Sequence, residues 1–316
     1  MTRTWFITGA NRGLGRAFTT AALAAGDRVV ATARNPESMA ELADDRLTVL
    51  PLDVREREAA IATVDKAFAL MGTIDVIVNN AGYGLVGALE ELTEAQIRDQ
   101  MDTNFYGALW VSQAAAPHLR AQGSGHIVQI STVGAVGSLP LFSMYNASKW
   151  ALEGFSASLA DELRPFGVRV TLAQMGGFDT DWAKSSMRFA TGIPAYEDLR
   201  SAVLGMPDYP TKAPADAPAT ATSGTPDGSE PAAVPGESTT RGGESADLAS
   251  SDAPGTETEW IEASPEIGAA GLIELVNMPN PPLRKVIGPG AHQMVAIALD
   301  QRRQDYVTDP EFTWPV

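Results

Sequence analysis

Residues 4–15 read Thr-Trp-Phe-Ile-Thr-Gly-Ala-Asn-Arg-Gly-Leu-Gly. An apolar run ends at Thr8, and a helical pattern occupies residues 15–25. Glycines between them permit a tight turn and close approach of the backbone to a ligand, and a helix N-terminus attracts negative charge. The stretch therefore predicts a strand, a turn and a helix that bind the pyrophosphate of a dinucleotide. The expected contacts come from Thr8, Gly9, Asn11, Arg12, Gly13, Leu14 and Gly15.

Beyond this unit, short β-branched runs alternate with amphipathic segments that are long enough for crossover helices. Strands are expected at residues 4–8, 28–32, 47–51, 75–79, 126–131 and 168–173, and helices at 15–25, 56–71 and 94–120. This alternation is typical of a parallel sheet with helices on both faces. Right-handed crossovers then predict an α/β, doubly wound parallel sheet (Rossmann fold) for residues 1–206.

The composition changes in residues 207–262. Between residues 207 and 259 there are ten acidic side chains against Lys212 and Arg241, together with eight prolines and few large apolar residues. Such a segment buries too little apolar surface to offset the entropy of ordering, so we expect a mostly disordered acidic insertion. Its role is open between a tolerated surface insertion and an acidic docking segment or substrate lid.

Residues 263–316 are expected to complete the same single domain. Proline at the first turn opens a helical pattern at 265–276, and a short strand follows at 284–287. A last helical stretch covers about 290–306, before a polar tail.

Composition and charge exclude several classes of function. Cysteine is absent and the histidines are only His118, His126 and His292, so thiol chemistry is excluded and a histidine-rich metal site is not expected. A net charge of −16 argues against binding to nucleic acid or anionic membranes. No apolar run reaches the roughly 18 residues of a membrane span, and the first strand leaves no room for a signal peptide. We therefore expect a cytoplasmic protein with a small-molecule substrate.

The end of the second strand predicts which dinucleotide binds. An acidic residue there would accept the ribose 2′-hydroxyl of NAD, but the sequence has Ala33 and Arg34. Arg34 and Arg12 offer two guanidinium groups to a 2′-phosphate, which favours NADP over NAD. The alternative is that Arg34 simply faces solvent.

Two further strand ends carry candidate cofactor contacts. Asp53 and Val54 lie just after the third strand, where the Asp53 carboxylate is placed to accept a hydrogen bond from the adenine amino group. Asn80, Ala81 and Gly82 close the fourth strand, at the edge where open α/β sheets bind ligands.

Tyr145 and Lys149 are four residues apart in Tyr-Asn-Ala-Ser-Lys. On a helix they share one face, so the Lys149 ammonium can favour the Tyr145 phenolate and lower the phenol pKa from its usual value near 10. The pair is therefore a candidate for acid–base work at neutral pH.

Taken in order, these motifs resemble the short-chain dehydrogenase/reductase family over residues 1–205 and 265–290. The matching pieces are Thr-Gly-x-x-x-Gly-x-Gly, Asn-Asn-Ala-Gly, Asn104 in Asp-Thr-Asn-Phe-Tyr-Gly, the pair Ser131-Thr132, and Tyr-x-x-x-Lys. The resemblance implies hydride transfer between nicotinamide C4 and a carbonyl or carbinol carbon. Tyr145 would be the general acid or base, Lys149 would hold the nicotinamide ribose, and Asn104 would hold a water that links Lys149 to solvent. The family often pairs helices into oligomers, so a homo-oligomer is possible.

The chain departs from the family pattern at two places. The serine that orients the substrate oxygen lies thirteen residues before the tyrosine in the family, and here that position is Thr132, with Ser131 as the adjacent alternative. The family's Pro-Gly after the sixth strand is replaced by Met175 and glycines, although Gly177 and Thr180 remain as expected contacts to the nicotinamide.

The segment 181–206 corresponds to the family's variable substrate cover and is rich in large apolar residues. It suggests an apolar or aromatic substrate, unless these side chains only pack on the core. The leading hypothesis is an NADP(H)-dependent oxidoreductase acting on a ketone, an aldehyde or a secondary alcohol. The alternative is a non-catalytic NADP-binding regulatory protein of the same fold.

Overall fold

The computed structural model describes residues 2–179, 186–210 and 263–313. Within these ranges, seven strands form one parallel sheet in the order β3-β2-β1-β4-β6-β7-β9. The strands are β1 (Thr4–Ile7), β2 (Arg28–Ala33), β3 (Leu47–Pro51), β4 (Val76–Asn79), β6 (Gly125–Thr132), β7 (Val168–Met175) and β9 (Arg284–Ile287). The order reverses between β1 and β4, which places a ligand crevice outside their carboxyl ends.

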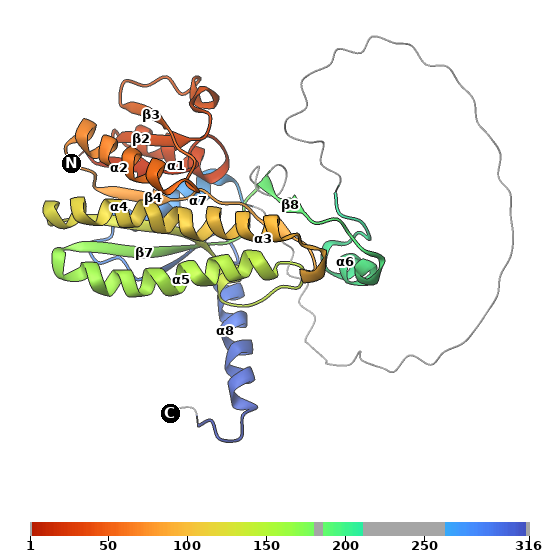
Figure 1. The fold of residues 1–316 in the computed structure, drawn as a ribbon. Helices are drawn as coiled ribbons and strands as arrows, with labels where there is room; N and C mark the ends of the chain where they lie inside the picture. The colour runs from red at the N-terminus through yellow and green to blue at the C-terminus, as the bar shows by residue number, and fades with distance from the viewer. Residues whose placement is uncertain (1, 180–185, 211–262, 314–316) are drawn as a thin grey trace, which may run out of the picture. The chain divides into compact units, whose positions relative to one another are not determined.

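Helices cover both faces of this sheet (Figure 1). One face carries α1 (Gly13–Ala24) and α7 (Pro265–Asn277), and the other carries α2 (Arg57–Met71), α4 (Gly107–Gln122) and α5 (Ser143–Leu163). Successive side chains of β1 serve the two cores in turn, because a strand alternates its faces: Trp5 and Ile7 join the first core and Phe6 the second. The predicted doubly wound fold is thereby confirmed.

The expected helix at 94–120 is interrupted. The structure has α3 (Glu94–Met101), a single π-helical turn (Asp102–Tyr106) and then α4. Single π turns inside α-helices accommodate one extra residue and often occur at functional sites. Here the turn presents Asn104 to the backbone of Tyr83, with which its amide exchanges two hydrogen bonds.

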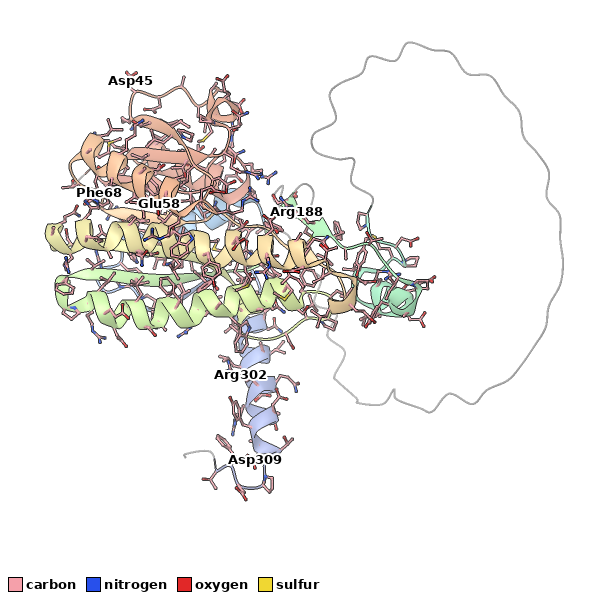
Figure 2. The ribbon with its side chains drawn as sticks, in the orientation of Figure 1. Asp45, Glu58, Phe68, Arg188, Arg302 and Asp309 are labelled. Atoms are coloured by element: carbon pink, nitrogen blue, oxygen red, sulfur yellow. The ribbon has the colours of Figure 1, made fainter. Side chains whose placement is uncertain are left out.

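A second, smaller sheet joins two segments that are far apart in the chain. Strand β5 (Leu85–Val86) pairs in parallel with β8 (Arg188–Phe189), and α6 (Glu197–Leu204) follows. Figure 2 labels Arg188 on β8, where it forms an ion pair with Asp99 of α3. A buried ion pair at 2.6 Å also joins Arg200 of α6 to Glu91, which follows β5 in the chain. Neither the small sheet nor these contacts were predicted.

The C-terminal elements match the expected positions. Phe178 forms an isolated bridge with Ala263, which leads into α7. Of the final helix α8 (Ala291–Val307) only Ala291 is buried, and the helix runs away from the sheet (Figure 1). Arg302 of α8, labelled in Figure 2, lies over the ring of Trp150 at 4.5 Å from its centroid. The predicted insertion lies outside the described residues from 211 to 262.

Short 3-10 turns connect the elements at Pro36–Met39, Leu89–Glu91, Val133–Ala135, Arg164–Phe166 and Pro194–Tyr196. In the part of the chain that the structure describes, no helix combines the length and apolar character needed to cross a membrane.

Candidate active site

The glycine turn between β1 and α1 has the shape expected for a phosphate site. Gly9 and Gly13 have φ values of 62° and 52°, in the left-handed region that favours glycine. A Cβ on Gly15 would lie 2.3 Å from the Gly9 carbonyl oxygen. The side chain of the N-cap residue, Arg12, makes no capping hydrogen bond to α1, so the first backbone N–H groups of the helix can serve an anion. These residues fit the pyrophosphate of a dinucleotide.

Thr8 and Asn80 hold this turn against the end of β4. The Thr8 hydroxyl accepts hydrogen bonds from the N–H groups of Asn80 and Ala81 at 2.9 and 3.0 Å. The Asn80 amide donates to the carbonyls of Thr8 and Gly9 at 3.0 and 3.1 Å. Thr8 and Asn80 therefore fix the position of the glycine turn relative to the end of β4.

The predicted adenine and 2′-phosphate contacts lie at the ends of β2 and β3. The Asp53 carboxylate is bound by Arg55, whose Nη2 lies 2.6 Å from Oδ2. This hydrogen bond holds the pKa of Asp53 below its usual value, and the charge of Arg34 contributes in the same direction. Arg34 is exposed, while Val54 is buried against Gly107 of α4.

Helix α5 brings Tyr145 and Lys149 to the cavity, and both side chains are buried. The Lys149 Nζ donates to the Ile130 carbonyl of β6 at 2.8 Å. Burial lowers the pKa of Lys149 to about 8, and the negative charge of Glu153 opposes this shift. Burial raises the pKa of Tyr145 to about 12, and its hydrogen bond with Thr132 opposes that shift. The expected lowering of the Tyr145 pKa is not seen, because desolvation of the phenolate outweighs the favourable contacts.

The hydroxyls of Ser131 and Thr132 have different partners. Ser131 donates to the buried Glu153 carboxylate at 2.7 Å. Thr132 hydrogen-bonds with Tyr145 and accepts the Gly134 N–H at 3.2 Å. Of these two adjacent hydroxyls, that of Thr132 contacts the phenol and that of Ser131 contacts a carboxylate.

Asn104 is buried in its π turn. Its Oδ1 accepts the Tyr83 N–H at 3.0 Å, and its Nδ2 donates to the Tyr83 carbonyl and the Ser148 hydroxyl at 2.9 and 3.2 Å. The side chain thus links the loop after β4 to α5, one residue before Lys149. The water-holding role implied by the resemblance stays a prediction.

A cavity of about 350 Å³ joins the glycine turn to the Tyr–Lys pair. Its lining includes these residues predicted from sequence: Gly9, Asn11, Arg12, Gly13, Leu14, Gly15, Asn80, Ala81, Gly82, Ser131, Thr132, Tyr145, Lys149 and Gly177. The predicted residues outside the lining are Thr8, Arg34, Asp53, Val54 and Asn104. Thr180 lies outside the described residues.

Sequence reasoning did not assign several residues of the lining to the site: Tyr83, Ile130, Met175, Gly176, Phe178 and Ser186. Met187, which also lines the cavity, was expected among the large apolar residues of the substrate cover. Tyr83 directly follows the Asn-Asn-Ala-Gly motif, Met175 is the last residue of β7, and Phe178 follows it at the ligand-binding edge. Extending each motif beyond its strand end would have found these three. Ser186 and Met187 lie directly before β8, in the segment 181–206 that is expected from the sequence to be the substrate cover. The path of that segment depends on tertiary contacts.

A doubly wound sheet with a glycine turn at its switch point, and a Tyr–Lys pair beside the same cavity, define a class of oxidoreductases that use a nicotinamide dinucleotide. Residues 3–190 match the family model described as short chain dehydrogenase. This match spans more than half of the chain, so the protein belongs to the short-chain dehydrogenase family and is an oxidoreductase.

Individual proteins resemble the chain in the same way. Oxidoreductase BOA17 of Botryotinia fuckeliana (strain B05.10) is 42% identical over 201 residues, which cover 62% of this chain and 73% of the relative. A crystal structure of a short-chain dehydrogenase from Streptomyces avermitilis matches with a TM-score of 0.75 and 30% identity, covering 97% of this chain and 95% of that one. A crystal structure of a metagenomic short-chain oxidoreductase in complex with NADP matches with a TM-score of 0.53 and 32% identity. This match covers 55% of this chain and 82% of that one.

Proposed function

We propose that this oxidoreductase reduces a ketone or aldehyde with NADPH and oxidises the corresponding secondary alcohol with NADP⁺. The observation that carries the proposal is the hydrogen bond between the Tyr145 phenol and the Thr132 hydroxyl at the cavity, one helical turn from buried Lys149. A carbonyl oxygen placed between the two hydroxyls would accept a hydrogen bond from each.

The roles of the side chains follow from this arrangement. When bound, the nicotinamide supplies the hydride in reduction and accepts it in oxidation. In reduction Thr132 orients the substrate oxygen, and Tyr145 gives its proton to that oxygen as the carbonyl carbon becomes a carbinol. The phenolate that remains is stabilised by Lys149, whose pKa of about 8 keeps most of the ammonium charged at pH 7.

The preference for NADP rests on charge at the ribose end of the site. Arg12 lies in the glycine turn, and Arg34 is exposed at the end of β2, where an acidic residue would reject a 2′-phosphate. The NADP complex of the metagenomic relative supports the same choice.

The substrate is proposed to be apolar or aromatic. Met175, Phe178 and Met187 contribute apolar side chains to the cavity lining, and Tyr83 adds an aromatic ring. Phe142 packs edge-on against the Tyr145 ring at a centroid distance of 6.3 Å. Such surroundings favour a carbonyl with apolar substituents, because they exclude water without satisfying additional polar groups.

Replacement of Tyr145 by Phe tests this function. We expect NADPH oxidation across a panel of alkyl and aryl ketones to fall by about 10²–10⁴-fold in Tyr145→Phe, because the proton donor is removed. The fluorescence of bound NADPH, measured in parallel, should show that cofactor affinity is retained. The same assay compares the KM values for NADPH and NADH.

Three results would count against the proposal. Undiminished turnover in Tyr145→Phe would contradict the mechanism, and a lower KM for NADH would contradict the cofactor preference. Tight NADPH binding without turnover of any substrate in the panel would favour a non-catalytic regulatory protein.

A further inference from the structure

Glu153 is a buried carboxylate on α5, one helical turn after Lys149, and it contacts three strands. Its Oε1 accepts hydrogen bonds from the Ser131 hydroxyl of β6 at 2.7 Å and from the Gln174 amide of β7 at 3.0 Å. Its Oε2 accepts from Nε of Arg284 on β9 at 2.7 Å. The carboxylate is therefore anchored where β6, β7 and β9 meet the helix of the catalytic pair.

A carboxylate is a costly choice for a purely structural anchor. Removing a charge from water costs several kcal/mol, and well-packed apolar residues can replace buried ion pairs without loss of stability. Among the described residues, the cation that is hydrogen-bonded to Glu153 is Arg284, whose side chain is itself about half exposed. The second cation is Lys149, which the helix places at i−4 from Glu153, and the charge of Glu153 opposes the effect of burial on the Lys149 pKa.

We propose that Glu153 is a positioning residue for the reaction, which favours the charged form of Lys149 while its hydrogen bonds join α5 to β6, β7 and β9. The inference rests on the proposed function, since it acts through the pair that carries it. This role also explains why the two adjacent hydroxyls have different partners. Ser131 donates a hydrogen bond to the Glu153 carboxylate, and Thr132 forms a hydrogen bond with the Tyr145 phenol.

The charged and polar groups around Lys149 and Glu153 determine whether a substitution raises or lowers the pKa of Lys149. Among the described residues, α5 contributes Tyr145 and Glu153, and β9 contributes Arg284. Strand β6 contributes the Ile130 carbonyl, which accepts from Lys149, and the neutral Ser131 hydroxyl. Strand β7 contributes the neutral Gln174 amide. We therefore expect removal of Glu153 to lower the pKa of Lys149, because the charge that opposes desolvation is lost. We expect removal of Arg284 to raise it, because the Glu153 carboxylate then no longer shares its charge with that cation.

The test is a titration of Lys149 in the full chain. The sequence contains five lysines, so ¹³Cε-labelled lysine gives few NMR signals, and Lys149→Arg identifies the relevant one. The variants are Glu153→Gln, Arg284→Gln and, as a matched control from the exposed side of the same helix, Glu162→Gln. This readout requires no substrate, so it stands apart from Tyr145→Phe, which tests the proposed function itself.

We expect the Lys149 pKa to fall in Glu153→Gln, to rise in Arg284→Gln and to be unchanged in Glu162→Gln. The alkaline limb of kcat should move in the same directions, with about tenfold less charged lysine above its pKa for each unit of decrease. A folded Glu153→Gln protein with the wild-type Lys149 titration overturns the proposal. If Glu153→Gln does not fold, an unchanged titration in Arg284→Gln overturns it.

Discussion

At the scale of single residues, Ser131 and Thr132 differ in what their hydroxyls bind, although they are adjacent on β6. A strand directs successive side chains to opposite faces, so only one of the two can face the Tyr145 phenol. The hydrogen bond of Thr132 with Tyr145 identifies it as that residue, and Ser131 is committed to Glu153. The adjacent hydroxyls are therefore expected to respond differently to mutation.

Thr132→Val removes the hydroxyl and keeps the branched shape. We expect kcat/KM for ketone reduction to fall by about tenfold to a hundredfold, the cost of one hydrogen bond to the reacting oxygen. Ser131→Ala should lower the unfolding free energy by about 1–2 kcal/mol, because Glu153 loses a donor, while turnover changes much less. Steady-state kinetics and urea unfolding separate the two effects. Loss of turnover in Ser131→Ala, with Thr132→Val unaffected, would reverse the assignment.

At the scale of elements, the first turn of α1 requires glycine at position 15 because neighbouring residues pack closely against it. Gly15 already has helical geometry, so its need for glycine comes from the space around it. The Gly9 carbonyl and the Asn80 amide lie 2.3 and 2.5 Å from the position of a Cβ on Gly15. Gly154 in α5 is a contrasting case, because a Cβ there would meet nothing within 4 Å.

Gly15→Ala and Gly154→Ala make a matched pair of helical substitutions. We expect Gly15→Ala to weaken NADPH binding by at least about tenfold and to lower Tm, because the turn must move to admit the methyl group. Gly154→Ala should stabilise the protein by about 0.5–1 kcal/mol through helix propensity alone, with binding unchanged. NADPH fluorescence titration and thermal unfolding measure both. Wild-type affinity in Gly15→Ala would show that the turn is not the binding site.

At the scale of the whole molecule, the candidate active site and a buried group that affects stability lie at opposite ends of the sheet. The carboxyl ends of the strands carry the cavity, whereas His126 is buried near the amino end of β6. The Thr171 hydroxyl donates to the Pro282 carbonyl, so it accepts from Nε2 of His126, and the buried Nδ1 has no hydrogen-bond partner among the described residues. Burial lowers the pKa of His126 to about 3, with Arg169 and Arg3 contributing.

This depressed pKa predicts acid sensitivity. Between about pH 6.5 and 3 the unfolded chain binds the His126 proton and the folded chain does not, so stability is complete above pH 6.5 and decreases as pH falls. The contribution approaches about 1.4 kcal/mol per pH unit within the window. Urea unfolding at pH 7.5 and 5 should show a smaller decrease in His126→Gln than in wild type. The exposed His292→Gln is the control, and an equal decrease in all three proteins would contradict the prediction.

Much of the architecture could be predicted because its signals are local. The expected strands agree with the observed ones to within two residues, and the glycine turn stands where its spacing placed it. The π turn at Asn104 and the two-residue strands β5 and β8 could not be predicted in this way. They are too short for a periodic pattern, and they depend on the Tyr83 backbone and on pairing between residues about 100 positions apart.

The sequence by itself determined the doubly wound fold, the dinucleotide turn and the Tyr145–Lys149 pair, because each depends on residues that are close in the chain. Only the tertiary structure decided which hydroxyl meets the phenol, which side chains close the cavity, and that the Glu153 carboxylate binds Ser131, Gln174 and Arg284. Those relations join β6, β7, β9 and α5, whose segments are brought together only by packing of the sheet. The balance between burial and charge that sets the Lys149 pKa exists only in that packed state.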